Sequence, residues 1–270
     1  MGKGLARVLV KTALDRLGKP PYDRECKKGS AGRGLKKAGT PARTKGMYAD
    51  VRMRKKKWAE PELNDCPYFV KDPAAQRGRW QEWFARRQPI RLELGCGKGT
   101  FASVSAFEHP EINFIAIDLI SDILGVARRN IADLFGDRPV ENLALAAWDI
   151  ERITQIFAPE DTVERIYINF CNPWPRGKHH KKRLTHTRQL ELYKTFLQDG
   201  GEIHFKTDDD LLFAESLGYL AQSGGFEVTY ETRDLHGSGY PGNIMTEHER
   251  MFSDQGIPIK FLIARYRKVL

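Results

Sequence analysis

The chain has 270 residues, of which 41% are hydrophobic, and its formal net charge is +9. This length accommodates one large α/β domain or two small ones, and no run of about 18 apolar residues suggests a membrane span. The four cysteines, Cys26, Cys66, Cys96 and Cys171, include no C-x-x-C pair. We therefore expect a protein of a reducing compartment, without a metal, a disulfide framework or a membrane attachment.

The positive charge is confined to the N-terminal part of the chain. Residues 1–50 contain 13 Lys and Arg against 4 Asp and Glu, whereas residues 51–270 contain 31 of each. The N-terminal part is rich in Lys, Gly and Pro, a composition that cannot bury enough apolar surface to fold. We expect a disordered basic extension over 1–50 and one globular domain over 51–270. Between an RNA tether and no specific role for the extension, we favour the latter.

The predicted elements begin after a basic strip at residues 52–57. Residues 68–87 predict a linker and one helix, and from residue 90 strand patterns alternate with helical patterns. Such alternation is typical of a doubly wound, mostly parallel α/β sheet with helices on both faces and ligands at the carboxyl ends of the strands. The seven predicted strands are 90–94, 113–118, 143–148, 165–170, 202–206, 226–232 and 260–267, and the predicted helices are 100–107, 121–135, 185–197 and 209–222.

A long segment, residues 234–259, joins the last two predicted strands in place of a helix. The segment is punctuated by Gly and Pro, as functional loops often are. Within it, Thr246 and Glu249 have the spacing of a helix-capping pair, which competes with a functional role for them.

A glycine-rich turn, LGCGKG at residues 94–99, follows the first predicted strand and opens a helix. Gly95 and Gly97 permit a tight turn and the close approach of a ligand. The G-x-G-x-G spacing differs from the G-x-G-x-x-G of dinucleotide-binding folds. The carboxylate of Glu93, two residues before the first glycine, would repel a phosphate and attract a cation such as a sulfonium or an amino group.

Acidic residues close the next two predicted strands. Asp118 ends the second strand, about 20 residues after the glycines, where an acid binds the two ribose hydroxyls of a nucleotide. Asp149 ends the third strand, where an adenine edge is usually held. This pattern favours S-adenosylmethionine over NAD, although tight turns and helix caps would also explain it. The predicted cofactor-binding residues are Glu93, Gly95, Gly97, Asp118 and Asp149.

The stretch INFCNPWPRGKHHKKRLTH, residues 168–186, is the most informative about the substrate. An apolar strand breaks at Asn172-Pro173, because proline cannot continue a strand ladder. The cation-rich loop that follows suits a flat, anionic ligand such as a nucleotide within a nucleic acid. Trp174 could stack on a base, but we favour a packed position between its two prolines. The candidate RNA-contacting residues are Lys178, His179, His180, Lys181, Lys182 and Arg183.

Five segments carry recognisable motifs: RMRKKKWA at 52–59, LELGCGKG at 92–99, INFCNPWPRGKHHKKRL at 168–184, IHFKTD at 203–208 and TEHER at 246–250. In this order they resemble the tRNA (guanine-N7-)-methyltransferases of the bacterial TrmB type, from about residue 52 to the end of the chain. The resemblance implies a Rossmann-like class I S-adenosylmethionine-dependent methyltransferase fold. It also implies a cytoplasmic enzyme, a monomer or a homodimer, that methylates N7 of a guanine in the tRNA variable loop.

The resemblance further implies roles for individual residues. Asn172 occupies the catalytic and cofactor-binding position, and Asp208 is the second catalytic candidate. The neighbouring Asp209 and Asp210 are more simply explained as acids at a helix N-terminus. The residues for which substrate binding is implied are Arg176, Asp208, Thr246, Glu247, His248 and Glu249.

Two positions depart from the family's usual pattern, which has Asp at the position of Asn172 and Lys at that of Arg176. An amide forms hydrogen bonds but carries no charge, whereas Arg keeps the cation with a different geometry. Guanine N7 has a lone pair and no proton to lose, so methylation needs in-line placement and no general base. A carboxylate can offset the charge that develops on the ring. Either none is essential at position 172, or Asp208 and Glu249 supply it.

Two other functions are compatible with the sequence. The turn from Asn172 to Pro175 is similar to the Asn-Pro-Pro-aromatic turn of amino-group methyltransferases, with the aromatic residue and the second proline exchanged. A non-catalytic RNA-binding protein could have the same fold, although the intact set of Glu93, Asp118 and Asp149 argues against it.

Overall fold

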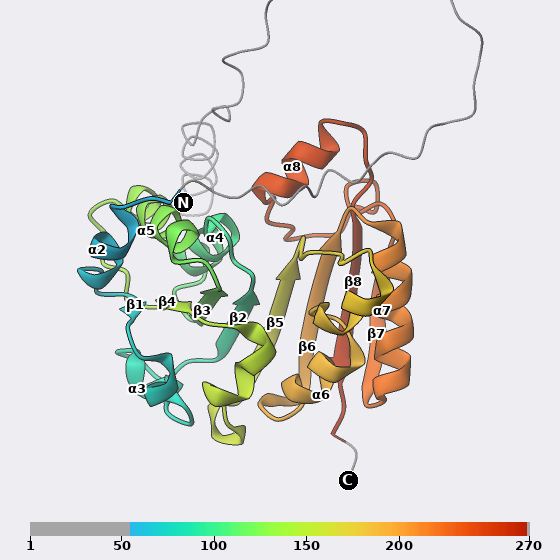
Figure 1. The fold of residues 1–270 in the computed structure, drawn as a ribbon, viewed down its shortest axis with the longest axis horizontal. Coiled ribbons are helices and arrows are strands. Elements are labelled where there is room, and N and C mark those ends of the chain that lie inside the picture. The colour runs from blue at the N-terminus through green and yellow to red at the C-terminus, as the bar shows by residue number, and fades with distance from the viewer. Residues whose placement is uncertain (1–54, 269–270) are drawn as a thin grey trace, which may run out of the picture.

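The computed structural model of this chain describes residues 55–268 (Figure 1). The predicted extension at residues 1–50 and the start of the basic strip, residues 52–54, lie outside the described residues. The strands are β1 (Phe69–Val70), β2 (Ile90–Leu94), β3 (Asn113–Asp118), β4 (Leu143–Ala147), β5 (Val163–Asn169), β6 (Leu197–Thr207), β7 (Phe226–Thr232) and β8 (Lys260–Tyr266). The α-helices are α2 (Ala59–Asn64), α3 (Trp80–Trp83), α4 (Thr100–Glu108), α5 (Ser121–Phe135), α6 (Thr187–Tyr193), α7 (Asp210–Ser223) and α8 (Glu247–Ser253), and the 3₁₀-helices are η2 (Pro73–Gln76), η3 (Ile150–Gln155), η4 (Pro159–Asp161) and η5 (Gly177–Lys182).

The strands form one sheet in the order β1-β4-β3-β2-β5-β6-β8-β7. Strands β1 to β6 pair in parallel, and β8 pairs antiparallel with both β6 and β7. The predicted mostly parallel, Rossmann-like sheet is therefore confirmed. The predicted number of seven strands is corrected to eight, because Phe69 and Val70, within the predicted linker, pair with β4 and form β1 at the sheet edge.

One predicted loop and one predicted helix also need correction. Residues 234–259 are not a loop throughout, because they contain α8, whose seven residues are too few to show a helical period. The helix predicted over 185–197 is shorter, since α6 ends at Tyr193 and β6 begins at Leu197. The backbone of Leu197 instead pairs with Val163 of β5, which extends β6 toward its N-terminal end.

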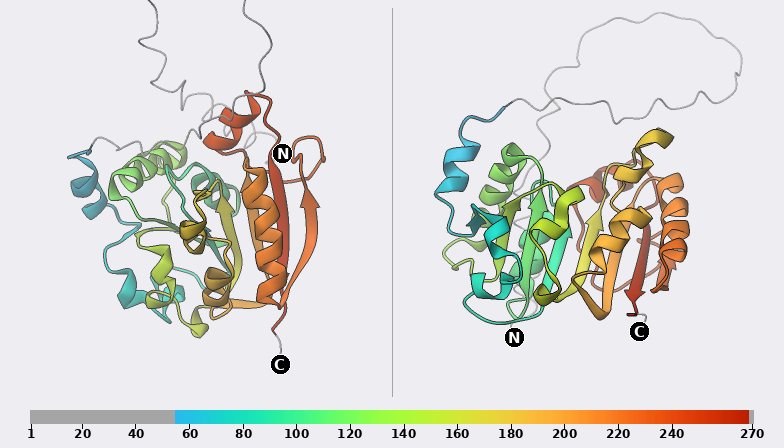
Figure 2. Two further views of the ribbon diagram at one scale, coloured as in Figure 1. Left: turned by 45° about the vertical axis from the view of Figure 1, so that its right-hand side comes forward. Right: turned by 60° about the horizontal axis from the view of Figure 1, so that its bottom comes forward.

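The sheet lies between two helical layers, as the views in Figure 2 show. On one face, α4 and α5 pack on the central strands and α2 packs on α5. The fully buried Leu124, Ala127 and Ile131 recur every three or four residues along α5, which gives this helix one apolar stripe against the sheet. On the other face, α6 and α7 cover strands β5 to β8 with a second, larger apolar cluster.

The chain reverses its direction of travel across the sheet between β2 and β5. The chain proceeds from β2 to β3 and β4 toward one edge, and then from β5 to β6 toward the other. The carboxyl ends of parallel strands on either side of such a switch point form a crevice in which ligands bind. Figure 1 shows α8 beyond this end of the strands. No helix among residues 55–268 has the length and apolar character needed to cross a lipid bilayer.

Candidate functional site

The glycine-rich turn after β2 presents bare backbone to open space. The amides of Gly95 and Cys96 both donate to the carbonyl of Ile117, at 2.9 and 3.0 Å, which ties the turn to β3. Gly95 and Gly97 have φ values of 79° and 53°, which favour glycine. No described atom lies within 4 Å of a Cβ built on either residue. A ligand can therefore approach the main chain closely at this turn.

The acid at the end of β3 holds the turn from the other side. Asp118 accepts hydrogen bonds from the amides of Gly97 at 2.9 Å and Ile120 at 3.1 Å. Burial raises the pKa of Asp118. The next two side chains are apolar yet exposed, Leu119 by 65%, and they offer a surface for a ring beside the acid. This combination fits a ribose and an adenine.

The predicted adenine-side acid also caps a helix. Asp149 accepts from the amide of Glu151 at 3.0 Å and is the N-cap of η3. A helix cap was the alternative to cofactor binding for this residue, and the structure shows that Asp149 forms one. Its side chain is partly exposed and follows β4, which lies next to β3 in the sheet.

A buried carboxyl group lies at the switch point itself. Glu93 of β2 is 2% exposed, and burial raises its pKa to about 8 although Asn169 and Lys206 act in the opposite direction. Its Oε1 accepts from Asn169 Nδ2 of β5 at 2.9 Å. Among the described residues, Glu93 Oε2 has no hydrogen-bond partner. An acceptor without a donor, on a buried acid beside an open glycine turn, fits a cationic group of a ligand.

The turn after β5 has a strained backbone. Phe170 and Trp174 have positive φ values of 54° and 44°, which are unfavourable for residues with a Cβ. Asn172 Oδ1 accepts from the amide of Trp174 at 2.9 Å and so stabilises this turn. A carboxylate oxygen could accept the same hydrogen bond, so the fold of the turn does not depend on which of Asn or Asp occupies this position.

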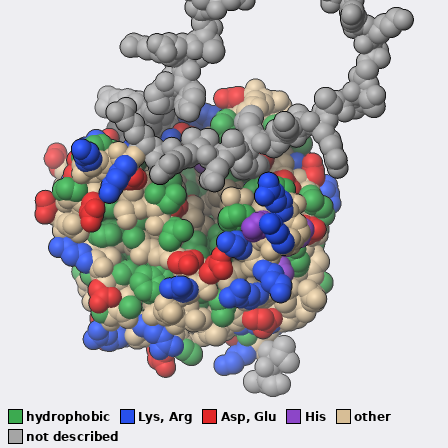
Figure 3. All heavy atoms as spheres, viewed as in Figure 1, with side chains coloured by type: hydrophobic (Ala, Val, Ile, Leu, Met, Phe, Trp, Pro, Cys, Tyr) green, Lys and Arg blue, Asp and Glu red, His purple; other side chains and the backbone are tan. Residues whose placement is uncertain are grey.

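The basic loop that follows contains η5 and exposes most of its cations. Arg176, Lys178, Lys181 and Lys182 are exposed, and Figure 3 shows Lys, Arg and His side chains gathered on the right-hand part of the visible face. Lys182 Nζ lies 5.2 Å from the centre of the Trp174 ring, and the His179 ring lies 5.7 Å from it. The indole therefore lies against the Lys182 and His179 side chains of the loop.

One predicted RNA-contacting residue of this loop, Arg183, is buried. Its side chain is 1% exposed, donates to the carbonyl of Pro173 at 2.7 Å and forms an ion pair with Glu215 of α7. It also donates to the hydroxyl of Tyr219 at 3.1 Å. Arg183 therefore fastens the basic loop to α7. The half-buried His180 lies on the same side, with Nδ1 4.0 Å from Glu215 Oε1.

The acids after β6 divide between two roles. Asp208 follows the strand directly and is partly exposed, and its carbonyl accepts from Lys260 Nζ at 2.9 Å. Asp209 is the N-cap of α7 and accepts from the amide of Leu212 at 2.6 Å. Asp210 lies in the first turn of the helix. The prediction that Asp209 and Asp210 are acids at a helix N-terminus is confirmed.

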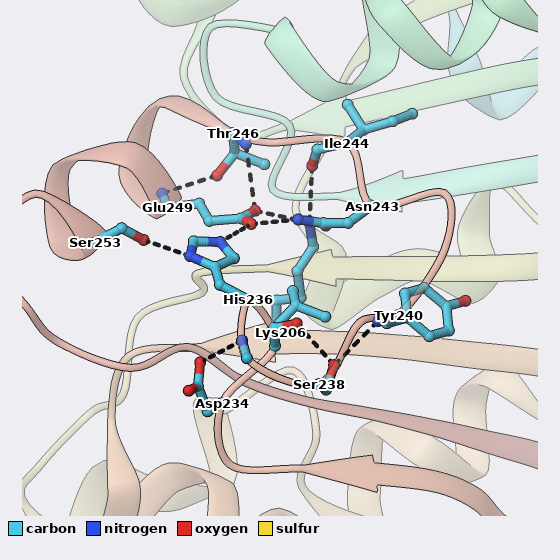
Figure 4. A network of polar contacts seen from close by, with 12 residues as sticks. Lys206, Asp234, His236, Ser238, Tyr240, Asn243, Ile244, Thr246, Glu249 and Ser253 are labelled. Atoms are coloured by element: carbon cyan, nitrogen blue, oxygen red, sulfur yellow. Dashed lines mark hydrogen bonds and ion pairs between the residues drawn. The ribbon is translucent and has the colours of Figure 1, made fainter.

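Thr246 and Glu249 form a capping box at the start of α8 (Figure 4). The Thr246 side chain accepts from the amide of Glu249 at 3.1 Å, and Glu249 Oε2 accepts from the amide of Thr246 at 3.4 Å. The capping role, open as an alternative for the sequence, is confirmed. Both side chains are buried, so they hold the segment in place, whereas the intervening Glu247 and His248 are exposed.

A buried ion pair anchors this capping box to the sheet (Figure 4). Lys206 of β6 donates to Glu249 Oε2, to Asn243 Oδ1 and to the carbonyl of Ile244, each at 2.9 Å. Glu249 Oε1 receives further hydrogen bonds from His236 at 2.8 Å and from Asn243 at 2.6 Å. Burial alone would raise the pKa of Glu249, but Lys206 and the other donors outweigh it and lower this pKa. Glu249 is therefore a charged group whose interactions lie inside the protein.

The sequence interpretation missed Lys206, His236, Asn243 and Asn169. The one signal for Lys206 was its place in the IHFKTD motif, because it shares one face of β6 with Glu202 and His204 and the strand pattern alone does not distinguish it from them. His236 and Asn243 carry no such signal, because a segment of irregular structure separates them in the sequence from their partner Glu249.

Helix α8 also contacts the cofactor-side turn. Lys98, in the glycine-rich turn, forms an ion pair with Glu247 at 2.7 Å. The ring of His248 lies 6.2 Å from that of Phe170 at the end of β5. The structure thus brings the predicted cofactor residues, the end of β5 and the TEHER motif to one edge of the sheet. Within residues 55–268, no group of three or more His, Cys, Asp or Glu side chains is arranged to hold a metal ion.

Comparison with known proteins gives a consistent result. A family model described as "Putative methyltransferase" matches residues 87–262. A tRNA (guanine-N(7)-)-methyltransferase of Clostridium beijerinckii is 57% identical over 216 residues, which cover 79% of this chain and 98% of the relative. The enzyme of the same name from Clostridium perfringens strain SM101 is 55% identical over 218 residues, 80% of this chain and 99% of the relative. A solved rRNA methylase from Streptococcus thermophilus is similar at 14% identity and a TM-score of 0.46, over 74% of this chain and 99% of that one.

Proposed function

The chain belongs to the tRNA (guanine-N(7)-)-methyltransferase family, and on this premise we propose that it transfers a methyl group from S-adenosylmethionine to N7 of a guanine in the tRNA variable loop. The observation that carries the proposal is the meeting of two unlike surfaces at one sheet edge. A buried acid and an open glycine turn lie on one side, and an exposed basic loop lies on the other. Because its substrate is tRNA, we propose a cytoplasmic enzyme.

The residues at the ends of β2, β3 and β4 would hold the cofactor. Glu93 would face its cationic methionyl end, Asp118 the ribose hydroxyls, and the exposed Leu119 and Ile120 the adenine ring. Asp149 would bind at the adenine edge. When bound, S-adenosylmethionine supplies an electrophilic methyl group on a sulfonium. The rigid turn at Gly95 and Gly97 fixes where that methyl group can lie, which is the main contribution that proximity makes to such a transfer.

The basic loop would position the tRNA through its phosphates. Arg176, Lys178, Lys181 and Lys182 are exposed, and contacts of this kind fix register without reading sequence. The major groove of A-form RNA is too narrow for side chains, so the guanine must be presented from a loop or an opened stack. Residues 51–270 carry no net charge, so the attraction for tRNA must come from local groups such as this loop.

The remaining groups would place and stabilise the base. Asn172, exposed at the turn after β5, offers an amide next to the reacting base without a charge. Asp208 would offset the positive charge that develops on the guanine ring. Glu247 and His248 would contact the substrate directly, and Thr246 and Glu249 would act on it through the shape of the segment that they hold.

One assay tests this proposal. Unmodified tRNA is incubated with the protein and isotopically labelled S-adenosylmethionine, digested to nucleosides and analysed by mass spectrometry. We expect labelled 7-methylguanosine, and none from a control tRNA in which the variable-loop guanine is replaced by adenosine. N6-methyladenosine would indicate an amino-group methyltransferase, and an absence of product with retained tRNA binding would indicate a binding protein; either result would overturn the proposal.

A further inference from the structure

Two buried acceptor atoms without donors lie together at the switch point of the sheet. Glu93 Oε2 and Asn169 Oδ1 have no hydrogen-bond partner among the described residues, and their side chains come from neighbouring strands, β2 and β5. Glu93 is 2% and Asn169 9% exposed. The two groups are already joined by the hydrogen bond from Asn169 Nδ2 to Glu93 Oε1. Their unpartnered oxygens therefore belong to one small polar site.

Such a pair is costly to leave unsatisfied, since each buried acceptor without a donor has lost its hydration without gaining a hydrogen bond in return. The orientation of the amide is determined by its partner: Nδ2 must face the carboxyl oxygen that accepts from it, which leaves Oδ1 as the open acceptor. With its pKa raised to about 8, Glu93 holds a proton near neutral pH in the free protein, and a cationic N–H donor can take the place of that proton. Native proteins satisfy most buried polar atoms, so these exceptions point to a missing donor.

The side-chain and turn donors nearest this place are engaged, and the backbone amide of Ala102 in α4 also interacts with Glu93. All three protons of Lys206, whose backbone pairs with Asn169, are directed to Glu249, Asn243 and Ile244. The amides of Gly95 and Cys96 are bonded to Ile117. Asn169 Oδ1 thus has no donor among the described residues, and a ligand group with several N–H donors and a positive charge would supply one to each of the two open oxygens.

We propose that Asn169 is a cofactor-binding residue whose amide oxygen, together with Glu93 Oε2, accepts hydrogen bonds from the α-ammonium group of the methionyl end of S-adenosylmethionine. This inference rests on the proposed function. The sulfonium centre has no N–H to donate, and the methionyl carboxylate would be repelled by Glu93, which leaves the ammonium group as the matching part of the cofactor. An asparagine suits the position because its NH₂ orients Glu93 while its oxygen binds the ligand.

The inference predicts a preference that can be measured without methyl transfer. Binding of S-adenosylhomocysteine and of its analogue lacking the α-amino group is measured by isothermal titration calorimetry. We expect wild type to prefer S-adenosylhomocysteine. In Asn169→Ala the affinity for S-adenosylhomocysteine should fall about tenfold or more, as for a hydrogen bond to a charged group, while the affinity for the deamino analogue stays within about twofold.

Two further variants keep the test decisive. Asn64→Ala, an exposed asparagine at the end of α2, is the matched control and should bind both ligands as wild type does. Asn169→Asp keeps the size of the side chain and an acceptor oxygen, so it should retain the preference for the amino ligand even if Asn169→Ala does not fold. Equal weakening of both ligands in every folded Asn169 variant, or equal affinity of wild type for both, would overturn the inference. Failure of wild type to bind S-adenosylhomocysteine at all would instead count against the proposed function.

Discussion

Replacement of Lys206 by methionine tests whether the buried ion pair holds the substrate segment. Methionine keeps most of the aliphatic stem of lysine but removes three hydrogen bonds and the charge opposite Glu249. Removing one partner of a buried ion pair costs about 3–5 kcal/mol, because the other charge is left uncompensated. Glu249 would retain the donors His236, Asn243 and the amide of Thr246, so we expect a loss near the lower end, about 3 kcal/mol.

This loss should be visible in both stability and substrate binding. For a domain of 150–250 residues, 1 kcal/mol corresponds to about 2–4 °C in Tm, so Lys206→Met should melt roughly 6–12 °C below wild type. We also expect a raised KM for tRNA, because α8 and the preceding loop lose their anchor. Above the pKa of Glu93 the affinity for S-adenosylhomocysteine should not fall, since Lys206 is a like charge to the cationic end of the ligand. Below that pKa the affinity should fall, because Lys206 lowers the pKa of Glu93 and its removal keeps Glu93 protonated to higher pH.

Matched variants separate the anchor from a general loss of stability. Lys194→Met removes a pair with the half-exposed Glu191 and a hydrogen bond to the carbonyl of Ser223, and it should cost about 1–2 kcal/mol, less than Lys206→Met. Adding Glu249→Gln to Lys206→Met removes the uncompensated charge and should restore part of the lost stability. Urea unfolding, thermal melting and steady-state kinetics provide the measurements. A stability within about 1 kcal/mol of wild type, or an unchanged KM for tRNA, would refute the proposed anchor.

Three other outcomes follow from the site. Burial raises the pKa of Glu93 to about 8, and pairing with a cation lowers this pKa, so ligand binding should release a proton. The affinity for S-adenosylhomocysteine should therefore weaken by up to about tenfold per pH unit as the pH falls below about 8. Glu93→Gln should abolish this pH dependence in calorimetric titrations. Lys182→Ala should reduce the salt dependence of tRNA binding by about one unit in the log–log plot, whereas Arg183→Ala should leave this slope unchanged and lower Tm; a reduced slope for Arg183→Ala would place its guanidinium on the RNA. Asp208→Ala should reduce kcat with little change in the affinity for S-adenosylhomocysteine, and equal losses of both would contradict the role proposed for Asp208.

The parts of this fold that the sequence predicted well are those encoded locally. The strands at 90–94, 113–118 and 226–232 have the predicted bounds, because each is an uninterrupted strand pattern with turn residues at both ends. The glycine turn and Asp118 were found for the same reason, since strand ends in a parallel sheet converge. Strand β1 has two residues and α8 seven, and neither is long enough to show a period.

The parts that escaped prediction depend on contacts between distant segments. In a run of cations such as residues 181–183, the sequence does not distinguish an exposed side chain from a buried one. Arg183 is the buried one because its guanidinium pairs with Glu215, which lies 32 positions further along the chain. The pairing of Lys206 with Glu249 likewise spans 43 positions. Such partners become visible only when the chain is folded, because no local pattern specifies which charge meets which.

The distribution of charge over the site explains how a neutral residue can occupy position 172. The cofactor side of the crevice carries the acids Glu93 and Asp118 together with Lys98, which pairs with Glu247, whereas the loop beyond Asn172 exposes cations toward the substrate side. A carboxylate at position 172 would lie between them and would be attracted to both the cofactor and the basic loop. An amide at position 172 carries no charge that would attract it to the cofactor or to the basic loop, and it still accepts the hydrogen bond from the Trp174 amide. Because N7 methylation requires no proton transfer, the reaction needs the geometry of that turn and no acid or base at position 172. The carboxylate that offsets the developing charge on the guanine can lie at the end of another strand, at Asp208.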